Sequence, residues 1–182
     1  MFEVAEAYER QRGRSSKILA PLFLEFACPY GEVLDVGCGT GALTFALAKN
    51  PTVSKIVDID PSGSFLAYTR FKTDDSRISF QEGDGQNLPF ADGAFNCSLA
   101  LLVISFIPDA PKAAQEMRRV TRRGGIVATA MCDNSAGNEL NQALWKRRCH
   151  LIPKRHNLKR GLDRMDRRKS SHPCGLTLAS PT

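Results

Sequence analysis

The sequence lacks any apolar run long enough to cross a membrane, and its N-terminus lacks the apolar core of a secretion signal. The chain opens with MFEVAEAYERQRGR, in which each pair of apolar residues is followed by a charged residue. A membrane-spanning helix needs about 20 predominantly apolar residues, and a secretion signal needs a continuous apolar segment. We therefore expect a cytoplasmic protein with no membrane segment and no secretion signal.

Paired cysteines are also missing. The six cysteines are scattered along 182 residues and form no C-x-x-C pair. This spacing predicts reduced thiols, with neither a zinc site nor a disulfide framework. The cysteines are Cys28, Cys38, Cys97, Cys132, Cys149 and Cys174. Cys38 lies in a glycine-rich turn, and we interpret it as a small residue tolerated there rather than as a nucleophile.

Histidine is absent from the first 145 residues, and aromatic residues are absent after Trp145. Residues 146–182 hold 11 basic and two acidic side chains, whereas residues 1–145 hold 14 basic and 17 acidic ones. The net charge of +6 therefore comes from the tail. A basic tail can bind nucleic acid, but a solvated charge run is the commoner case. We predict a folded domain over 1–145 and a disordered basic tail over 146–182.

Predicted strands alternate with predicted helices along the folded part. The pattern indicates strands at 32–37, 54–60, 77–84, within 93–106 and at 126–132, and helices at 3–12, 15–27, 41–50, 63–71 and 110–121. Strands that are nearly all apolar favour a parallel sheet covered on both faces. The predicted fold class is therefore α/β, with a doubly wound, Rossmann-like, mostly parallel sheet.

The segment VLDVGCGTGALT places Gly37, Gly39 and Gly41 between a predicted strand and a predicted helix. Turns of this kind hold nucleotide-like ligands. The spacing also satisfies the dinucleotide pattern, with Asp58 at the distance expected for a ribose contact, so spacing alone leaves NAD open. A phosphate-binding loop that ends in Gly-Lys-Ser/Thr is excluded, because no lysine follows Gly41.

Three carboxylates favour a ligand without a pyrophosphate. Asp35 stands two positions before Gly37, where it would repel a pyrophosphate but suit a ligand with an ammonium and a sulfonium group. Asp58 ends a predicted strand and can accept hydrogen bonds from both ribose hydroxyls. Asp84, in EGDGQNLPF, can accept one from an adenine amine. We interpret Asp60 as a cap of the following helix.

Residues 32–131 resemble a class I S-adenosylmethionine-dependent methyltransferase, close to the type 11 group that includes quinone-biosynthesis methyltransferases. The matching pieces follow the family's order and are VLDVGCGTGALT, VDIDPSGSFLAYTR, GDGQNLPFADGAFN, LLVISFIPDAPKAAQEMRRVTRRGG and IVATA. Residues 1–31 resemble the N-terminal lid helices of this family. The resemblance implies S-adenosyl-L-methionine as the cofactor and 1–145 as the methyltransferase domain.

The resemblance also implies which positions contact the cofactor. The backbone of the glycine turn would cradle its methionine part, Asp58 its ribose, and Asp84 with Gly85 its adenine. The implied cofactor-binding residues are Asp35, Gly37, Cys38, Gly39, Gly41, Asp58, Ile59, Asp84, Gly85, Ala100 and Leu101. No catalytic residue and no metal ligand is assigned.

The chain departs from the family after Trp145. The family's sheet has seven strands, whereas five are readable here, so we expect the last strands to be missing and the chain to be C-terminally truncated or altered. A small-molecule methyl acceptor is favoured, because the N/D-P-P-Y signature of amino-methylating enzymes is absent. Two alternatives stay open: an inactive protein that only binds the cofactor, and a nucleic-acid methyltransferase anchored by the basic tail.

Overall fold

The computed structural model describes residues 3–131 and 176–178 of the chain. The chain divides into one compact unit of Met1–Ala130 with Thr177–Thr182 and another of Met131–Leu176. The fold described below is that of the first unit. The boundary predicted after Trp145, and the tail predicted to be disordered, lie outside the described residues except for 176–178.

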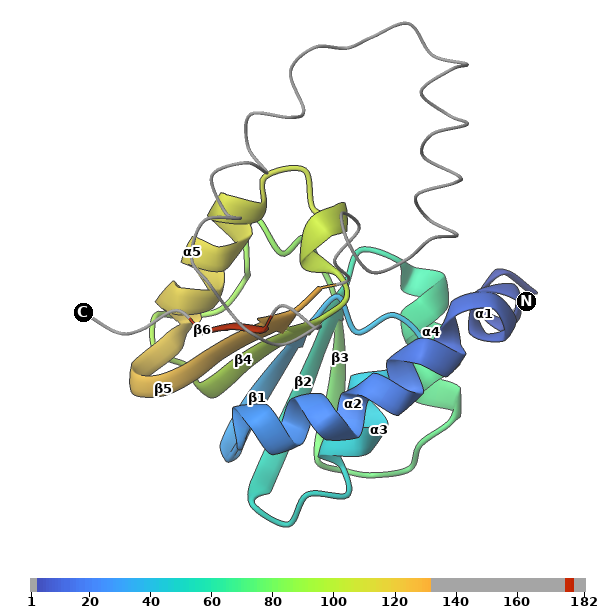
Figure 1. The fold of residues 1–182 in the computed structure, drawn as a ribbon, viewed down its shortest axis with the longest axis horizontal. Coiled ribbons are helices and arrows are strands. Elements are labelled where there is room, and N and C mark those ends of the chain that lie inside the picture. The colour runs from blue at the N-terminus through green and yellow to red at the C-terminus, as the bar shows by residue number, and fades with distance from the viewer. Residues whose placement is uncertain (1–2, 132–175, 179–182) are drawn as a thin grey trace, which may run out of the picture. The chain divides into compact units, whose positions relative to one another are not determined.

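A mostly parallel sheet forms the centre of the first unit (Figure 1). Its strands are β1 (Gly31–Val36), β2 (Val53–Asp60), β3 (Ile78–Glu82), β4 (Phe95–Leu101), β5 (Thr121–Ala130) and β6 (Leu176–Leu178), in the order β3-β2-β1-β4-β5-β6. The pairings of β1 with β2 and β4, of β2 with β3 and of β4 with β5 are parallel. Strand order reverses at β1, which confirms the predicted doubly wound fold.

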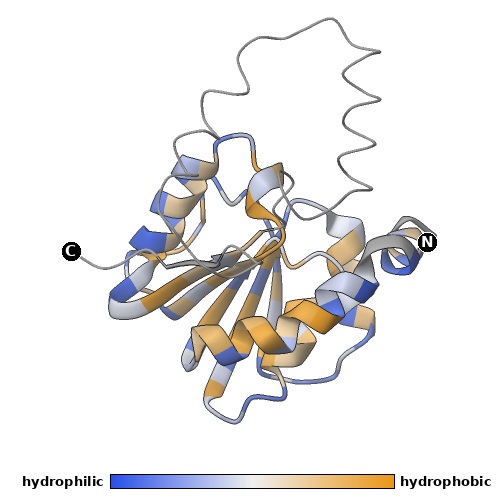
Figure 2. Cartoon of the chain, in the orientation of Figure 1, coloured by the Kyte–Doolittle hydropathy of each residue, from blue (hydrophilic) through white to orange (hydrophobic). Residues whose placement is uncertain are grey.

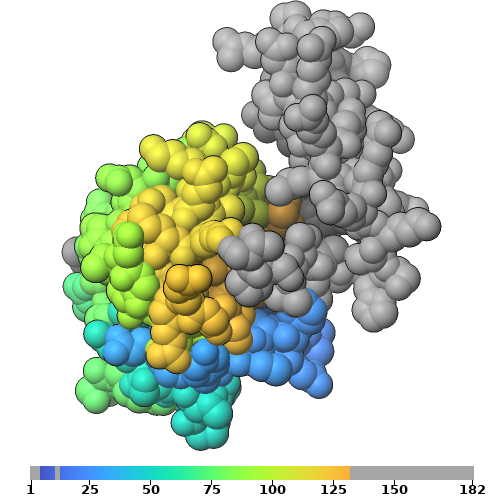
Figure 3. All heavy atoms as spheres, turned by 90° about the vertical axis from the view of Figure 1, so that its left-hand side faces the viewer, coloured from blue at the N-terminus to red at the C-terminus, as the bar shows by residue number. Residues whose placement is uncertain are grey.

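Helices cover both faces of this sheet. They are α1 (Glu3–Tyr8), a π-helical turn η1 (Glu9–Gly13), α2 (Arg14–Ala27), α3 (Ala42–Leu47), α4 (Gly63–Phe71), a 3₁₀ turn η2 (Ile104–Phe106) and α5 (Ala110–Val120). Helices α2, α3 and α4 lie on one face and α5 lies on the other. Figure 3 shows β5 in orange between α5 in yellow and the N-terminal residues in blue. Within residues 3–131, no helix is both long and apolar enough to cross a membrane.

The core consists of the side chains between the sheet and these helices. Apolar strand residues such as Val33, Leu34, Ile56 and Leu99 are fully buried. In Figure 2 the strands are mostly orange, and α2 is largely orange as well, because it exposes the apolar residues Ile18, Leu22 and Phe26. A strand whose two faces are both covered needs apolar residues at successive positions rather than alternating ones. The apolar runs in the sequence therefore identified the sheet.

The interpretation of Asp60 as a helix cap was wrong. Ser62 is the N-cap of α4, and its side chain accepts a hydrogen bond from the backbone N–H of Phe65. Asp60 instead accepts one hydrogen bond from the backbone of Ser62 at 2.8 Å and another from the backbone of Gly39 at 2.9 Å. Its carboxylate therefore joins two loops at the carboxyl edge of the sheet.

The predicted start of the fifth strand also differs from the structure. The sequence pattern predicted a strand only from residue 126, yet β5 begins directly after α5 and contains both Gly124 and Gly125. Phe95 pairs with Thr121 while Cys97 pairs with Ile126, so β5 bulges between these pairings. A Cβ on Gly125 would lie 2.5 Å from the Asn96 carbonyl oxygen, so the bulge requires glycine at this position.

The expectation that the tail forms no sixth strand was wrong as well. Residues Leu176–Leu178 form β6, which follows β5 in the strand order. An edge strand of three residues leaves little signal in a sequence, because strand periodicity needs at least four residues to be read.

Candidate functional site

The glycine turn joins β1 to α3 at the carboxyl edge of the sheet. The backbone N–H groups of Gly37 and Cys38 donate to the carbonyl oxygen of Ile59, at 2.7 and 3.3 Å. Gly37, Gly39 and Gly41 have φ angles of 71°, 55° and 85°, a left-handed conformation that favours glycine. The turn is therefore a backbone structure fixed against the end of β2.

Space beside the three glycines is unequal. A Cβ on Gly37 would lie 2.3 Å from the Val103 side chain, and one on Gly41 would lie 2.5 Å from Thr69. A Cβ on Gly39 would have no atom within 4 Å. The turn is therefore closely packed at Gly37 and Gly41 and has free space beside Gly39. A ligand that binds to the backbone of the turn needs such a space.

Asp60 holds the backbone of Gly39, the glycine in the middle of the turn, by a hydrogen bond. Its Oδ2 accepts the backbone N–H of Gly39, while the Thr69 hydroxyl donates to the Gly39 carbonyl oxygen at 3.1 Å. Asp60 retains 7% of its surface at the last position of β2. Burial raises the pKa of Asp60, although the hydrogen bonds from Ser62 and Gly39 oppose that rise. The N–H and the carbonyl group of Gly39 are thus both hydrogen-bonded, while the space beside its Cα stays free.

Asp35 and Asp58 form a buried pair beneath α3. They are register partners on β1 and β2, so their side chains point to the same face of the sheet. Both lie beside Thr44, whose Oγ1 is 2.7 Å from Asp58 Oδ2 and 3.3 Å from Asp35 Oδ2. The exposed fractions are 1% for Asp35 and 0% for Asp58, and Asp58 Oδ1 has no hydrogen-bond partner.

Burial is the main electrostatic influence on this pair. It raises the pKa of Asp35 to about 7, against an ordinary value of 3.8, and the hydrogen bond with Thr44 only partly opposes it. Burial also raises the pKa of Asp58, and the neighbouring charge of Asp35 adds to that rise. The pair therefore resists carrying two negative charges.

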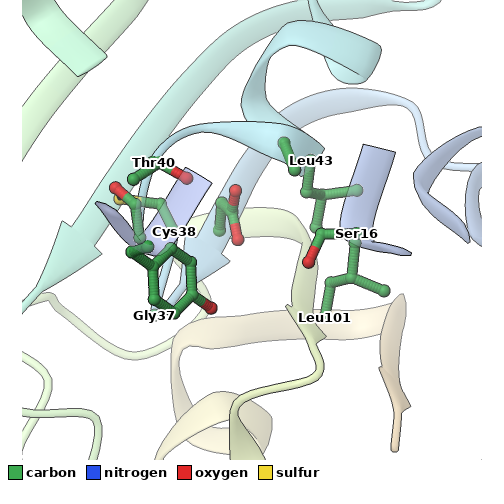
Figure 4. Close-up of a pocket in the computed structure, with 10 residues that line it drawn as sticks. Ser16, Gly37, Cys38, Thr40, Leu43 and Leu101 are labelled. Carbon is green, nitrogen blue, oxygen red and sulfur yellow. The ribbon is translucent and has the colours of Figure 1, made fainter. Parts of the chain in front are cut away.

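A small pocket opens between the glycine turn and the N-terminal helices (Figure 4). Figure 4 shows Gly37, Cys38 and Thr40 on one side of it, and Ser16, Leu43 and Leu101 on the other. The predicted residues among its lining are Asp35, Gly37, Cys38, Gly39 and Leu101, and Tyr8 lies in the segment predicted to form the lid. The lining residues that sequence reasoning missed are Ser16, Thr40, Ala42 and Leu43. The N-terminal helices thus supply part of the wall.

Contacts of α1 and η1 fasten these helices over the turn. The Thr40 hydroxyl donates to Glu9 Oε1 at 2.5 Å, and Glu9 also forms an ion pair with Lys17. Burial raises the pKa of Glu9, but its hydrogen bonds with Lys17 and Thr40 outweigh this, so the net shift is downward. The Tyr8 ring lies 5.3 Å from the ring of Phe65 on α4. No local sequence pattern marks these contacts, because the residues lie far apart in the chain.

Residues 34–129, more than half of the chain, match the methyltransferase domain family. The chain belongs to this family. Membership implies S-adenosylmethionine as the cofactor of this methyltransferase domain. Among curated relatives, the malonyl-[acyl-carrier protein] O-methyltransferase of Pectobacterium atrosepticum is 35% identical over 116 residues, which cover 64% of this chain and 44% of that protein. The methyltransferase domain described here thus spans less than half of that relative's length.

Solved structures show the same fold. A putative S-adenosyl-L-methionine-dependent methyltransferase from Methanococcus maripaludis superposes with a TM-score of 0.64 at 21% identity, covering 90% of this chain and 80% of its own. The [4+2]-cyclase SpnF superposes with a TM-score of 0.57 at 28% identity, covering 63% and 44%. Proteins with this fold therefore carry the names of more than one reaction, so function has to be argued from the site.

The remaining predicted residues lie around the pocket of this methyltransferase domain rather than in its wall. Ala100 is fully buried within β4, and Ile59 is buried behind the turn. Asp84 is exposed after β3, where its carboxylate accepts hydrogen bonds from the backbone and side chain of Gln86 at 2.9 Å each. Gly85 is buried, and a Cβ there would lie 3.1 Å from Val36.

The loop after β4 turns back towards the glycine turn. Leu102 has a φ angle of 60°, an uncommon conformation for a residue with a side chain, and its N–H donates to the Ala130 carbonyl oxygen at 2.8 Å. This reversal brings Val103 against Gly37. Leu101 thereby closes one wall of the pocket. Strained backbone of this kind clusters at functional sites.

Proposed function

We propose that this methyltransferase domain binds S-adenosylmethionine at the glycine turn and transfers its methyl group to a small-molecule acceptor. The observation that carries the proposal is the open space beside Gly39, where a Cβ would meet no atom within 4 Å. The backbone of Gly39 is held on both sides, by Asp60 and Thr69. Ligands of open α/β sheets bind in this position, outside the carboxyl ends of the strands where strand order reverses.

The charge of the pocket supports a cationic ligand. Asp35 lines the pocket and is the carboxylate that we assign to the ammonium and sulfonium end of the cofactor. A pyrophosphate in the same place would bring negative charge to an acidic wall, which disfavours NAD. The thiol of Cys38 shares this wall, and burial, followed by the charges of Asp58 and Asp35, raises its pKa. Cys38 therefore stays a neutral thiol, and its backbone N–H supports the turn.

We assign the ribose hydroxyls to Asp60 rather than to Asp58, which the sequence had favoured. Asp58 is 0% exposed and lies beneath Thr44 of α3, whereas Asp60, at the carboxyl end of β2, is buried but retains 7% of its surface. A carboxylate offers about four lone-pair sites, and backbone groups use two of those on Asp60. Two sites therefore remain for a diol.

The adenine is assigned to the loop after β3. Asp84 is exposed there, and its hydrogen bonds from Gln86 lower its pKa, so it is ionised and can accept from an exocyclic amine. Gly85 lets the backbone come close to a ring, and Leu88 adds a buried apolar side chain. Ile59 and Ala100 are assigned a supporting role, because both are buried behind these contacts.

When bound, the cofactor supplies a methyl group on a sulfonium that leaves readily. The chain's own contribution is to orient the reactants and exclude water. Leu101 forms an apolar wall, and the helices that carry Tyr8 and Ser16 cover the opposite side of the pocket. We assign no general base, since the three histidines lie after Trp145, outside the described residues. The proposed catalytic effect is therefore one of positioning.

The small-molecule acceptor stays a proposal; one relative is named a malonyl-[acyl-carrier protein] O-methyltransferase, so the acceptor named for that protein is a malonyl group borne on a carrier protein. The proposed division of the chain is a lid over 1–31 and a cofactor-binding core over 32–131. A cytoplasmic location stays a prediction.

Titration calorimetry with three ligands tests the proposal. S-adenosylmethionine and its demethylated product S-adenosylhomocysteine should each bind with one-to-one stoichiometry, while NAD should give no binding heat. The Asp60→Asn variant should bind both ligands more weakly, and Asp74→Asn, which changes an exposed carboxylate after α4, serves as the matched control. Binding of NAD without any response to the sulfonium compound would overturn the proposal.

A further inference from the structure

Glu9 connects three segments that form the wall of the pocket. Its Oε1 accepts a hydrogen bond of 2.5 Å from the Thr40 hydroxyl, and its Oε2 forms an ion pair with Lys17. Glu9 directly follows Tyr8, and Lys17 directly follows Ser16. Tyr8, Ser16 and Thr40 all line the pocket. One carboxylate therefore joins η1, α2 and the glycine turn beside the side chains that face the ligand space.

The environment of Glu9 keeps its carboxylate charged and fixed. The side chain is only 11% exposed. Burial raises the pKa of Glu9, but its hydrogen bonds with Lys17 and Thr40 outweigh burial, so the net pKa shift is downward. The charge of Lys72, at the end of α4, acts in the same direction. A largely buried carboxylate is costly without such partners, so the contacts with Thr40 and Lys17 decide where this one lies.

Gly13 makes room for this carboxylate. It ends the π-helical turn that Glu9 begins, it is buried, and its φ of −59° is an ordinary helical value. A Cβ at this position would lie 2.6 Å from Glu9 Oε1, the oxygen that accepts from Thr40. Glycine is less favourable than alanine in a helical conformation. The space that the Glu9 carboxylate occupies gives a reason for glycine here, and π-helical turns are frequent at functional sites.

We propose that Glu9 is a positioning residue: through Thr40 it holds the N-terminal helices against the glycine turn and thereby retains the bound cofactor. The inference rests on the proposed function and assigns Glu9 no contact with the cofactor itself. What depends on Glu9 is the rate at which the ligand leaves, because Tyr8 and Ser16 have to move away from the turn before the pocket opens.

A glutamate-to-alanine change on the full chain tests the proposal by surface plasmon resonance, with S-adenosylhomocysteine as the probe. Glu9→Ala should raise the dissociation rate constant about tenfold, the scale of one lost hydrogen bond to a charged group, and change the association rate constant by less than about twofold. Glu6→Ala removes an exposed carboxylate of α1 and should behave as the wild type. Unchanged dissociation from a folded Glu9→Ala protein would overturn the inference alone. A wild type that binds no S-adenosylhomocysteine would overturn the proposed function and this inference with it.

Glutamine at position 9 separates the two contacts of the carboxylate. Its side-chain oxygen can still accept from the Thr40 hydroxyl, but a neutral amide cannot form the ion pair with Lys17. Since the proposal assigns the effect to Thr40, dissociation from Glu9→Gln should stay closer to the wild type than to Glu9→Ala. A glutamine variant that releases the ligand as fast as the alanine variant would contradict the link through Thr40.

The effect of Glu9 has to disappear when Thr40 cannot donate. Thr40→Val keeps the shape and removes the hydroxyl, and it should have an effect of its own because Thr40 lines the pocket. Adding Glu9→Ala to Thr40→Val should then raise the dissociation rate no further, whereas independent effects on the rate would multiply. Full multiplication is the result expected of a purely structural Glu9, and it would refute the proposal.

Gly13→Ala separates the stability of the helix from the retention of the ligand. Alanine is the better helix former, so this variant should lower the melting temperature less than Glu9→Ala does, or not at all. Its methyl group needs the position of Glu9 Oε1, so the carboxylate has to leave Thr40, and dissociation should quicken about as much as in Glu9→Ala. In the Glu9→Ala background, where that position is empty, Gly13→Ala should leave dissociation unchanged. Wild-type dissociation from Gly13→Ala would overturn the proposal, and so would a further acceleration in the Glu9→Ala background.

Discussion

The backbone N–H of Gly39 donates a hydrogen bond of 2.9 Å to the carboxylate of Asp60. This bond connects the middle of the glycine turn with the last residue of β2. Because a Cβ on Gly39 would meet open space, the bond fixes the turn without filling the room beside it. Asp60 therefore shapes the backbone of the proposed site in addition to its proposed ribose contact.

Replacing Asp60 by alanine should weaken binding of S-adenosylhomocysteine by about 1.5–3 kcal/mol, the scale of lost charge-assisted hydrogen bonds. The variant loses the proposed ribose contacts and the bond to Gly39 together. Titration calorimetry at pH 8 measures the change, with Asp74→Ala as the surface control. An unchanged dissociation constant in a folded Asp60→Ala protein would restrict Asp60 to a structural role.

Alanine at Gly39 and alanine at Gly37 should have different effects. Gly39→Ala places a methyl group in open space, so it should mainly reduce cofactor affinity, with strain at φ 55° adding about 1 kcal/mol of destabilisation. Gly37→Ala places a methyl 2.3 Å from Val103 and should lower the melting temperature more. Thermal melts and calorimetry on both variants give the comparison. Equal melting temperatures with unchanged affinity would show that the turn is not the site.

Arg119 fastens the loop that carries the proposed adenine contacts. Its guanidinium donates to the carbonyl oxygens of Phe90 at 2.7 Å and Leu88 at 2.9 Å. Lysine cannot reproduce this fork, so Arg119→Lys should destabilise the fold by about 1–2 kcal/mol. Hydrogen exchange should become faster over residues 84–92, and Arg123→Lys, at an exposed position in β5, should leave it unchanged. If hydrogen exchange in Arg119→Lys is as slow over residues 84–92 as in the wild type, Arg119 does not hold this loop.

The sheet and the glycine turn were predictable because their signals are local. A strand buried on both faces needs an apolar run, and a turn with three left-handed residues needs glycines. The choice between Asp58 and Asp60 was not local. Both lie on the same face of β2 and both are buried, and only the packing of α3 over the sheet places Thr44 against Asp58 and leaves Asp60 with 7% of its surface. The ribose assignment to Asp58, made from the sequence, and the assignment to Asp60, proposed from the packing, both stay predictions.

Contacts between distant segments were equally hidden. Glu9 and Thr40 are 31 positions apart, and neither carries a motif. The start of β5 was predicted too late for a related reason, since two adjacent glycines usually mark a turn. Here they fit a close approach to the Asn96 backbone, which depends on the neighbouring strand. The sequence therefore predicted which elements form, and tertiary packing decided which side chains meet.

The buried charge of Asp35 should cost stability at high pH. Its pKa in the folded protein is about 7, against 3.8 for an ordinary aspartate, so between these values the folded state binds more protons than the unfolded state. Stability contributed by this group is therefore greatest below about pH 4, falls as pH rises through that window, and is lowest above about pH 7. Asparagine at this position has no proton to lose.

Asp35→Asn should consequently be more stable than the wild type at pH 8 and close to it at pH 4. The expected gain at pH 8 is roughly 3 °C or more in melting temperature. The same variant should lose affinity for S-adenosylhomocysteine, because the proposed partner of the ammonium is gone. Thermal melts at half-unit steps from pH 4 to pH 8.5 measure the difference between the two proteins. If the difference in melting temperature stays constant with pH, Asp35 keeps an ordinary pKa. If the difference grows with pH while the variant binds the ligand more weakly, Asp35 is retained for ligand binding at a cost in the stability of the fold.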